Sequence, residues 1–287
     1  MNYQMQRLSA GLYLVGVPIG TARDITLRAL DVLASADQLA AEDTRSLRKL
    51  MDIHGVPLGD RRVHALHDHS GRAVQERLLT AIREGQSVAY ASEAGMPLIA
   101  DPGFELVRAA GDAGLAVTSA PGPSAVTTAL AVGGLPTDAF FFAGFLPNAK
   151  SARCKALEAL RTVPGTLVFY ESPKRVLAML RDASDVLGPG RYCSVCRELT
   201  KKFEEVVRGS LEEVAEKFNQ KAPKGEFVIL IERTKVETTS VDEVDAALRD
   251  ALSRMSMRDA VDAVSQALEM PRRKVYQMAL SLQKDTQ

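Results

Sequence analysis

The sequence predicts an α/β protein of two α/β domains followed by a helical C-terminal tail. From Gly11 to about Ser119, short β-rich runs alternate with amphipathic helical stretches. Such alternation is typical of a mostly parallel sheet with helices on both faces. Strand-like runs continue to residue 232, and from Val241 the periodicity is only helical. We therefore divide the chain into domains at 1–120 and 121–235 and a tail at 241–287.

The first domain is expected to hold five strands, whose carboxyl ends are where ligands of such sheets bind. Asp24 is placed to cap a helix that carries Leu27, Leu30 and Leu33, and Ser70 is placed to cap another. The expected strands span residues 12–16, 38–42, 62–66, 87–91 and 115–119.

The second domain begins at a hinge, PGPSA at 121–125. Three of its expected strands follow one another without a long helix between them, which predicts antiparallel pairing. A polar stretch at 233–240 reads as a linker, and two short helices around a turn at 269–271 resemble a helix-turn-helix. The expected strands span residues 140–145, 166–172, 191–196, 203–209 and 226–232.

Composition bounds the class of protein. The 287 residues include 36 Lys and Arg and 36 Asp and Glu, so the formal net charge is zero and the surface is not positively charged throughout. A local basic patch is still compatible with this balance. No apolar run approaches the roughly 18 residues of a membrane span, and the N-terminus lacks the apolar core of a signal peptide. Three cysteines fit a reducing compartment. We expect a cytoplasmic protein that does not contact membranes.

The segment 92–103 is the strongest local signal of a site. It follows the expected strand at 87–91 and holds two glycines and two prolines within a dozen residues. This composition fixes an unusual backbone path whose amides and carbonyls point into a crevice. By contrast, Gly16 and Gly20 do not form a G-x-G-x-x-G pattern, and their loop reads equally well as a plain turn.

Two groups of metal-binding residue types are not interpreted as metal sites. Cys193 and Cys196 are three apart in an expected strand, so their side chains leave opposite faces, and no second pair completes a zinc site. His64, His67 and His69 lack carboxylate or thiolate partners at ligand spacing. We read them as a solvated or RNA-facing loop and predict no metal.

Nine motifs occur in an order that resembles the tetrapyrrole methylase superfamily, and within it the branch that methylates ribose 2′-hydroxyls of small-subunit ribosomal RNA. The segments YESP and RELTK point to this branch. The resemblance covers essentially the whole chain. The motifs are VGVPIG (15–20), AEDTR (41–45), AG-x-P-x-I-x-DPG (94–103), PGPSA (121–125), GLPTD (134–138), GFLP (144–147), YESPKR (170–175), RELTKKFEE (197–205) and GEFV (225–228).

The resemblance implies a homodimer of chains with two α/β domains and S-adenosyl-L-methionine in the cleft between them. The chain departs from the branch pattern at Glu93, Met96, Leu98 and Ala100, where Asp, Thr, Gly and Ser are usual. By resemblance, the residues that contact the cofactor are Pro18, Gly95, Met96, Pro97, Ile99, Ser124, Ala125, Leu146, Gly225 and Glu226.

Methyl transfer from a sulfonium requires the protein to hold the ribose hydroxyl in place and to accept its proton. The alternative for Glu171–Lys174 and Arg197–Glu198 is that they are structural ion pairs. The candidate catalytic residues are Glu171, Lys174, Arg197 and Glu198. The candidates for contact with 16S ribosomal RNA are Arg45, Arg175, Lys201, the tail residues Arg272, Arg273 and Lys274, and His67, which aligns with a cleft histidine of the branch.

Two other functions stay open at the sequence level. One is a methyltransferase that acts on a corrinoid or another tetrapyrrole, and the other is a nucleic-acid-binding regulator without enzymatic activity. The basic tail argues against the corrinoid enzyme, which has no use for it. The loop at 92–103 and the RELTK segment argue against the regulator, because a scaffold needs neither.

Overall fold

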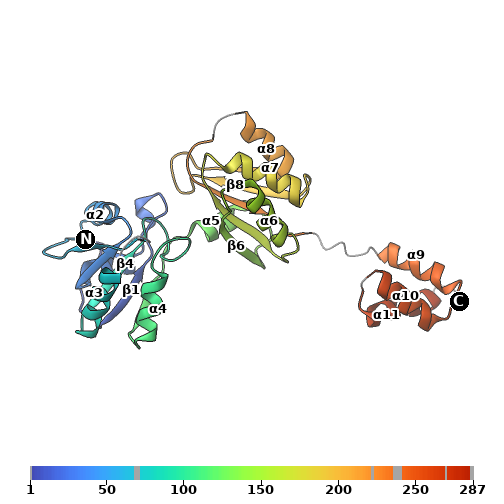
Figure 1. The fold of residues 1–287 in the computed structure, drawn as a ribbon, viewed down its shortest axis with the longest axis horizontal. Coiled ribbons are helices and arrows are strands. Elements are labelled where there is room, and N and C mark those ends of the chain that lie inside the picture. The colour runs from blue at the N-terminus through green and yellow to red at the C-terminus, as the bar shows by residue number, and fades with distance from the viewer. Residues whose placement is uncertain (1, 68–71, 221–222, 235–240, 269, 285–287) are drawn as a thin grey trace. The chain divides into compact units, whose positions relative to one another are not determined.

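The computed structural model describes residues 2–67, 72–220, 223–234, 241–268 and 270–284. Two compact units make up the chain, Met1–Thr234 and Lys235–Gln287. The first unit contains two five-stranded sheets with their helices, and the second is helical (Figure 1). Ser70 and Glu269, to which the sequence assigned a cap and a turn, lie outside the described residues.

The first sheet is entirely parallel, with the strand order β3-β2-β4-β1-β5. The five predicted strands are confirmed, with ends that shift by at most two residues. Because β1 and β4 are central, the loops that follow them meet at one edge of the sheet. The strands are β1 (Gly11–Val15), β2 (Gln38–Ala41), β3 (Val63–Ala65), β4 (Ser87–Ala91) and β5 (Val117–Ala120).

Helices bury both faces of this sheet. One core joins the sheet to α1 and α2, and another joins it to α3 and α4. The predicted cap at Asp24 is wrong: Asp24 ends a short 3-10 turn, and the hydroxyl of Thr26 accepts from the Ala29 amide at 3.1 Å to begin α1. The elements are η1 (Ala22–Asp24), α1 (Leu27–Ser35), α2 (Thr44–Ile53), α3 (Arg72–Arg83) and α4 (Phe104–Asp112).

The second sheet is mixed, with the order β6-β7-β10-β8-β9. Antiparallel pairing is confirmed for β7, β8, β9 and β10, whereas β6 pairs with β7 in parallel. Helices α6, α7 and α8 cover one face, and α5 covers the other. The elements are α5 (Ala125–Gly133), β6 (Phe140–Phe145), α6 (Lys150–Leu160), β7 (Thr166–Glu171), α7 (Val176–Leu187), β8 (Tyr192–Arg197), β9 (Glu205–Ser210), α8 (Leu211–Asn219) and β10 (Phe227–Ile231).

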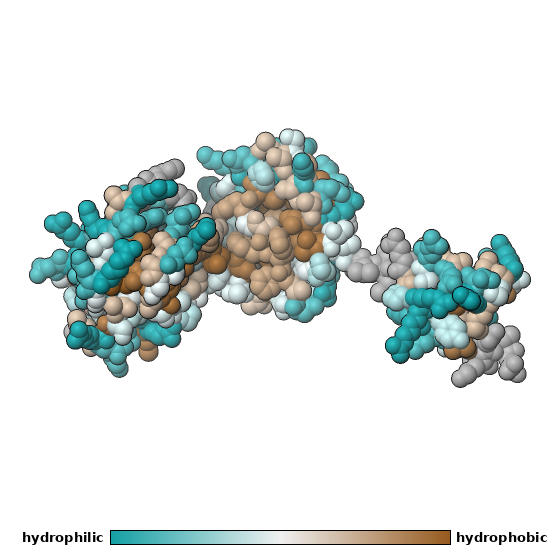
Figure 2. All heavy atoms as spheres, turned by 60° about the horizontal axis from the view of Figure 1, so that its bottom comes forward, coloured by the Kyte–Doolittle hydropathy of each residue, from teal (hydrophilic) through white to brown (hydrophobic). Residues whose placement is uncertain are grey.

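Apolar side chains also remain on the surface of this unit. Figure 2 shows apolar surface on the part that carries the second sheet. There Phe140 and Phe141 on the edge strand β6 are 47% and 44% exposed, and Val132 on α5 is 36% exposed. An edge strand with exposed apolar side chains is open to pairing with another chain.

The C-terminal unit has a small core of its own. Val244, Val261 and Val275 are fully buried, one from each of its three helices. The hydroxyl of Ser256 caps α10 by accepting from the Asp259 amide. No helix among the described residues of the chain is long and apolar enough to cross a membrane. The helices are α9 (Val241–Leu252), α10 (Met257–Ala267) and α11 (Arg272–Lys284).

Candidate active site

A cavity of about 650 Å³ opens at the carboxyl ends of β1 and β4 in the unit Met1–Thr234. The loops after these strands form one wall, and the ends of β6, β7, β8 and β10 form the other. The volume lies within the range of roughly 300–1,000 Å³ in which proteins bind small molecules. The position agrees with the expectation that ligands bind at the strand ends of a parallel sheet.

The loop at 92–103 has the unusual backbone that its composition predicts. Gly95 has a φ of +76°, and Leu98 and Ala100 also have positive φ values of 72° and 63°. Side chains other than glycine rarely adopt this conformation, so the loop holds backbone strain beside the cavity. Reciprocal backbone hydrogen bonds of 2.9 and 3.1 Å between Val17 and Gly95 fix the loop to the segment after β1.

Two glycines bring the backbone of the hinge against the loop after β1. A Cβ atom on Gly16 would lie 2.6 Å from the Gly122 amide nitrogen, and one on Gly122 would lie 2.9 Å from Gly16. The Gly122 amide also contacts the sulfur of Met96 at 3.2 Å. These contacts leave no room for side chains, so the two glycines set how closely the three segments approach.

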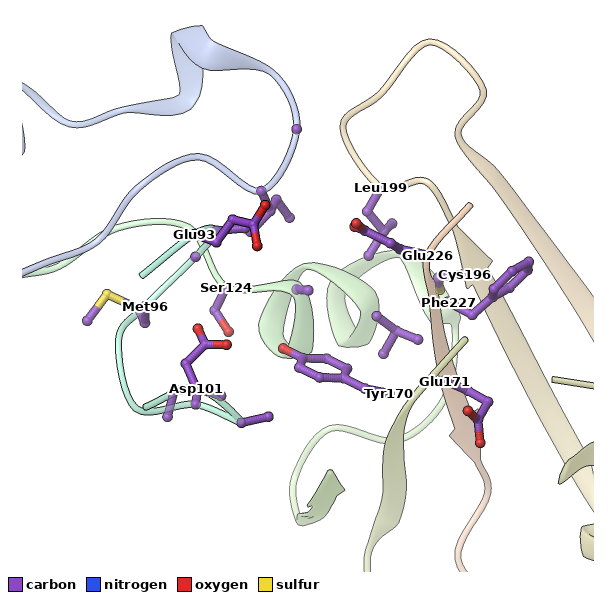
Figure 3. A pocket seen from close by; sticks show the side chains of 18 of the residues that line it. Glu93, Met96, Asp101, Ser124, Tyr170, Glu171, Cys196, Leu199, Glu226 and Phe227 are labelled. Atoms are coloured by element: carbon purple, nitrogen blue, oxygen red, sulfur yellow. The ribbon is translucent and has the colours of Figure 1, made fainter. Parts of the chain in front are cut away.

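Carboxylates dominate the polar lining of the cavity. Figure 3 shows Glu93 and Glu226 with their carboxylates pointing toward one another from opposite walls. The negative lining favours a ligand with positive charge, such as a sulfonium and its neighbouring ammonium group. Together with the close backbone approach at Gly95, it fits S-adenosyl-L-methionine. The charged groups in the described lining are Glu42, Glu93, Asp101, Glu171, Glu226 and Lys201.

Three polar side chains converge near the middle of the cavity. Figure 3 shows the Asp101 carboxylate, the Ser124 hydroxyl and the Tyr170 hydroxyl pointing toward one another. Burial raises the pKa of Tyr170 to about 12, and the negative charge of Asp101 adds to this effect. Tyr170 therefore stays protonated at neutral pH and is available as a hydrogen-bond donor. The arrangement unites groups from the loop at 92–103, the hinge and β7.

Glu171 belongs to a different local network. Its side chain points away from Asp101 and Tyr170 (Figure 3), and the residue is only 3% exposed. The Ser172 amide donates to its Oε1 at 2.8 Å, and Arg175 pairs with its Oε2 at 3.1 Å. Burial raises the pKa of Glu171, although the Ser172 amide and the Arg175 charge oppose the shift.

Lys201 holds together the segment after β8 and the start of β10. Its Nζ donates to Glu198 at 3.0 Å and to Glu226 at 2.9 Å, and the Glu226 amide donates to Glu198 at 3.0 Å. Burial acts to raise the pKa of Glu198, but the hydrogen bonds from Lys201 and the Glu226 amide outweigh it and lower the pKa. This segment keeps Lys201 and Glu226 in place on the cavity wall.

The same segment also contacts the loop after β1. The Thr21 amide donates to the Thr200 hydroxyl at 3.2 Å, and the Thr21 hydroxyl donates to the Thr200 carbonyl. A Cβ atom on Gly20 would lie 2.6 Å from Cγ of Lys201. Glu198 and Thr200 both have positive φ values, 50° and 64°, so this contact also relies on strained backbone.

The cavity lining includes most of the residues predicted to contact the cofactor, but not all of them. Leu146 is 5% exposed and packs in the core between the second sheet and its helices. Pro97 is buried, and Gly225 packs against Glu198, so neither lines the cavity. The predicted residues in the lining are Pro18, Gly95, Met96, Ile99, Ser124, Ala125 and Glu226.

Of the predicted catalytic residues, only Glu171 lines the cavity. The ion pairs expected within Glu171–Lys174 and Arg197–Glu198 form with other partners. Glu171 ends β7 and pairs with Arg175, four residues on, across the turn after β7, and Lys174 is exposed. Arg197 pairs with Glu205, which lies directly opposite it on β9, at 3.0 Å.

The predicted RNA-contacting residues do not form one cluster. Lys201 is in the cavity wall, while Arg45 is 88% exposed at the start of α2 and pairs with Asp43. Arg175 donates to the Leu146 carbonyl and to the Asn148 side chain, so protein partners hold its guanidinium. His67 is exposed after β3. Arg272, Arg273 and Lys274 open α11 in the C-terminal unit.

Several residues of the cavity were absent from the predicted site. Asp101 and Tyr170 lie within the motifs DPG and YESP, but neither residue was among the predicted site residues. Phe145 lies in GFLP, next to Leu146, which was predicted to contact the cofactor. Glu42 and Glu93 are neighbours, since the Glu93 amide donates to Glu42 at 3.1 Å. Glu42 follows β2 and Glu93 follows β4, and this position after a strand was the sequence signal that they belong to the site.

The two cysteines of β8 have the predicted environment. Both are fully buried, Cys193 in the core against α7 and α8 and Cys196 in the core against α5, so they leave opposite faces of the sheet. Burial raises the pKa of Cys193 to about 12 and that of Cys196 to about 11. Within the described part of the chain, no three His, Cys, Asp or Glu side chains are grouped to hold a metal ion.

Comparison with known proteins adds family information to this geometry. Residues 11–215 match the family model "Tetrapyrrole (Corrin/Porphyrin) Methylases", and residues 238–283 match "RsmI C-terminal HTH domain". A "Ribosomal RNA small subunit methyltransferase I" from Mesorhizobium japonicum is 42% identical over 97% of this chain and 94% of its own length. The Mycobacterium tuberculosis protein of that name is 48% identical over 72% of this chain and 73% of its own.

Solved structures share the fold. The methyltransferase CobJ superposes with a TM-score of 0.57 at 19% identity, covering 79% of this chain and 95% of its own. Uroporphyrin-III C-methyltransferase of Thermus thermophilus, complexed with S-adenosylhomocysteine, gives a TM-score of 0.53 at 22% identity, covering 77% and 96%. Both agree with the predicted pair of α/β domains.

The family model spans most of the two sheets, and the sequence relatives extend through the C-terminal helices. The chain therefore belongs to the tetrapyrrole methylase family and, within it, to the ribosomal RNA small subunit methyltransferases I.

Proposed function

We propose that this chain transfers a methyl group from S-adenosyl-L-methionine to the ribose 2′-hydroxyl of a cytidine in 16S ribosomal RNA of the small subunit, in the cytoplasm. The observation that carries the proposal is the cavity at the strand ends, with five carboxylates and one ammonium group in its described lining. That lining suits a sulfonium cofactor. The names of the relatives, at 42% and 48% identity, support the ribosomal substrate.

The same lining disfavours the corrinoid alternative. Tetrapyrroles of this class carry carboxylate side chains around the whole ring, and a site for them needs several Lys or Arg groups. Lys201 is the one cation in the described lining, and Glu198 and Glu226 already bind it. An RNA substrate presents a ribose and a base to the cavity, while its phosphates stay outside.

The bound cofactor supplies a methyl group activated by the positive sulfur. The chain must hold the ribose hydroxyl in line with that methyl group and accept its proton. We assign the proton to the Asp101 carboxylate, which points into the cavity toward Ser124 and Tyr170. The protonated Tyr170 hydroxyl is placed to orient the reacting groups by donating a hydrogen bond.

The four residues first predicted as catalytic take supporting roles in this proposal. Glu171 holds Arg175, whose guanidinium also reaches Leu146 and Asn148 and so fixes the turn after β7. Glu198 positions Lys201, and Arg197 ties β8 to β9. Lys174 is exposed at the turn after β7, from which its ammonium group can approach a phosphate.

RNA contact is assigned to Lys201 in the cavity wall, to Arg45, His67, Lys174 and Arg175 elsewhere in the unit Met1–Thr234, and to the basic start of α11. Asp262 of α10 pairs with Arg272 of α11 and partly neutralises it. The exposed side chains of Arg273 and Lys274 therefore carry most of the attraction for phosphate. Their place in the first turn adds the favourable dipole of the helix.

We also propose that the chain forms a homodimer through the open edge of the second sheet. Phe140 and Phe141 on β6 expose apolar surface at this edge. Burial of such surface between two copies would remove it from water. Sedimentation of the wild type and of a Phe141→Glu variant tests this contact, and an unchanged dimer in the variant would exclude it.

One assay tests the function as a whole. The protein is incubated with methyl-labelled cofactor and small ribosomal subunits, naked 16S RNA or a corrinoid precursor, and the label is mapped. We expect label on a ribose of the RNA and none on the tetrapyrrole. Label on the tetrapyrrole, or on an RNA base instead of a ribose, would contradict the proposal.

A further inference from the structure

A β-bulge in the edge strand β6 decides where Phe145 lies. In the pairing of β6 with β7, Phe142 is opposite Val168, but Gly144 is opposite Phe169 and Phe145 is opposite Tyr170. One extra residue therefore enters β6 between Phe142 and Gly144. Gly144 has a φ of +66°, a conformation that glycine adopts without penalty.

The extra residue reverses the face on which Phe145 lies. In regular alternation, Phe145 would lie opposite to Phe142 and face the core under α6 and α7. With the bulge, it shares the face of Phe142 and Tyr170, which is the face of the cavity. Bulges next to active sites commonly redirect a side chain in this way.

The ring of Phe145 is partly held by protein and largely exposed. It meets the Tyr170 ring edge to face, with ring centres 5.7 Å apart at 65°, and Tyr170 in turn contacts Phe142 at 4.9 Å. Phe145 nevertheless remains 56% exposed while it lines the cavity. An aromatic ring supported at its edge and open to the cavity is suited to stack on another planar ring.

We propose that Phe145 is the stacking platform for the base of the target nucleotide. This inference rests on the proposed function, because it requires an RNA substrate. The wall with Gly95 and Met96 is on the other side of the cavity and takes the cofactor, whereas Phe145 comes from the second sheet and is open to solvent, from which the RNA arrives. A base taken out of its stack loses stacking free energy, and stacking on an aromatic side chain offsets part of this loss.

The absence of tryptophan from the chain offers a direct test. A Phe145→Trp variant carries its one tryptophan at the platform, and stacking of a base should quench the fluorescence of that tryptophan. We expect quenching by the substrate RNA in the presence of S-adenosylhomocysteine, and little change with S-adenosylhomocysteine alone. Equal quenching by S-adenosylhomocysteine alone would assign the ring to the adenine of the cofactor, and quenching by neither ligand would remove it from the site. Either result overturns the inference.

Kinetics supply an independent arm. Phe145→Ala should raise KM for small subunits by about 5- to 100-fold. Phe145→Tyr keeps an aromatic ring and should have a KM close to that of the wild type. In both variants the cofactor affinity, measured by calorimetry, should stay within twofold of the wild-type value. Tyr192→Ala is the matched control, since it removes a 40% exposed aromatic ring from the opposite end of the same sheet. A wild-type KM in Phe145→Ala would refute the platform, while an inactive wild type would instead refute the proposed function.

Discussion

Gly16 and Gly122 touch backbone to backbone, at a spacing that a single methyl group on either residue would not fit. Gly16 directly follows β1 of one sheet, and Gly122 belongs to the hinge that leads into the other. Met96 closes the contact, because its sulfur lies 3.2 Å from the Gly122 amide. Three motifs distant in sequence are thus held together behind Met96, which lines the cavity.

The first prediction concerns this contact. Gly16→Ala should weaken binding of S-adenosyl-L-methionine by at least about tenfold, because the added Cβ would lie 2.7 Å from the Met96 sulfur and displace the loop that forms the site. Isothermal calorimetry measures the affinity, and circular dichroism checks the fold. Gly111→Ala is the control, since Gly111 lies in α4 with nothing near its Cβ position. Equal affinities in the two variants would contradict the cavity as the cofactor site.

The second prediction concerns the proton acceptor. Asp101→Asn should lower kcat by roughly 100-fold or more, in the range typical of a lost general base, and leave cofactor affinity within a few fold. The acid limb of the pH–rate profile should also disappear, because the carboxylate that must be ionised has gone. Glu171→Gln serves as comparison: it should lower turnover less, as Glu171 points away from Asp101 and Tyr170. A wild-type pH profile in Asp101→Asn would exclude this assignment.

Local pattern predicted the strands because burial on two faces of a sheet leaves a strong signal in β1, β4, β7, β8 and β10. The start of α1 was harder to predict, because Asp24 and Thr26 are both good capping residues two positions apart. In the structure Asp24 belongs to the 3-10 turn before α1, and Thr26 caps the helix. The bulge at Gly144 left no pattern of its own, so the side on which Phe145 lies could be seen only in the register with β7.

The site was harder to predict because its groups come together only through tertiary structure. Asp101 lies in the loop after β4 of the first sheet and Tyr170 lies on β7 of the second, and the two meet across the cavity. Arg197 is adjacent to Glu198 in sequence, yet the positive φ of Glu198 turns that carboxylate toward Lys201. Arg197 instead meets its cross-strand neighbour Glu205, a partner that follows from register and not from sequence distance.

The third prediction concerns a buried ion pair. Arg153 on α6 and Asp182 on α7 are 6% and 3% exposed, and their charged groups are 2.6 Å apart. Asp182→Ala should lower the free energy of unfolding by about 3–5 kcal/mol, because it leaves the guanidinium buried without its partner. Asp185→Ala, an exposed position on the same helix, should change it by no more than about 0.5 kcal/mol. Urea denaturation measures both.

A double variant shows whether the loss of stability comes from the missing charge partner or from lost packing. Arg153→Met combined with Asp182→Leu replaces the pair by apolar side chains and should recover most of the stability, since no buried charge remains. If the double variant is as unstable as Asp182→Ala, packing and not charge explains the loss.

The fourth prediction concerns the pH dependence of stability. The Ser87 hydroxyl and amide donate to Asp37 at 2.6 and 2.8 Å, and these hydrogen bonds lower the pKa of Asp37. A lowered pKa in the folded state contributes stability above the ordinary carboxyl pKa of about 4, and this contribution is lost as the pH falls through the folded value. Asp37→Asn should therefore be less stable than wild type at pH 7, and the difference should vanish toward pH 2–3.

Thermal unfolding across this range checks the sign. Asp60→Asn, at an exposed position after α2, is the matched control and should follow the wild type at every pH. A gap between Asp37→Asn and wild type that stays constant from pH 7 to pH 3 would show that the carboxylate charge is not the cause.

The last prediction concerns the C-terminal unit. Ending the chain at Thr234 should leave cofactor affinity unchanged, because the cavity and both sheets belong to the unit Met1–Thr234 and the C-terminal helices have a core of their own. Methylation of small subunits should become much weaker, through KM and not kcat. The basic residues at the start of α11 would be lost, and with them contacts to phosphate.

The salt dependence of substrate affinity distinguishes the loss of phosphate contacts from the loss of a dimer contact. Each lost phosphate contact should reduce the slope of log affinity against log salt by about 0.7–0.9, so the truncated protein should approach the wild type at low ionic strength. The full-length pair of substitutions Arg273→Ala and Lys274→Ala should reproduce part of the effect while leaving α11 and its core in place, since both side chains are exposed. If truncation instead produces monomers with weak cofactor binding at every salt concentration, the C-terminal unit acts in assembly. Full activity of the truncated protein on small subunits would contradict both roles.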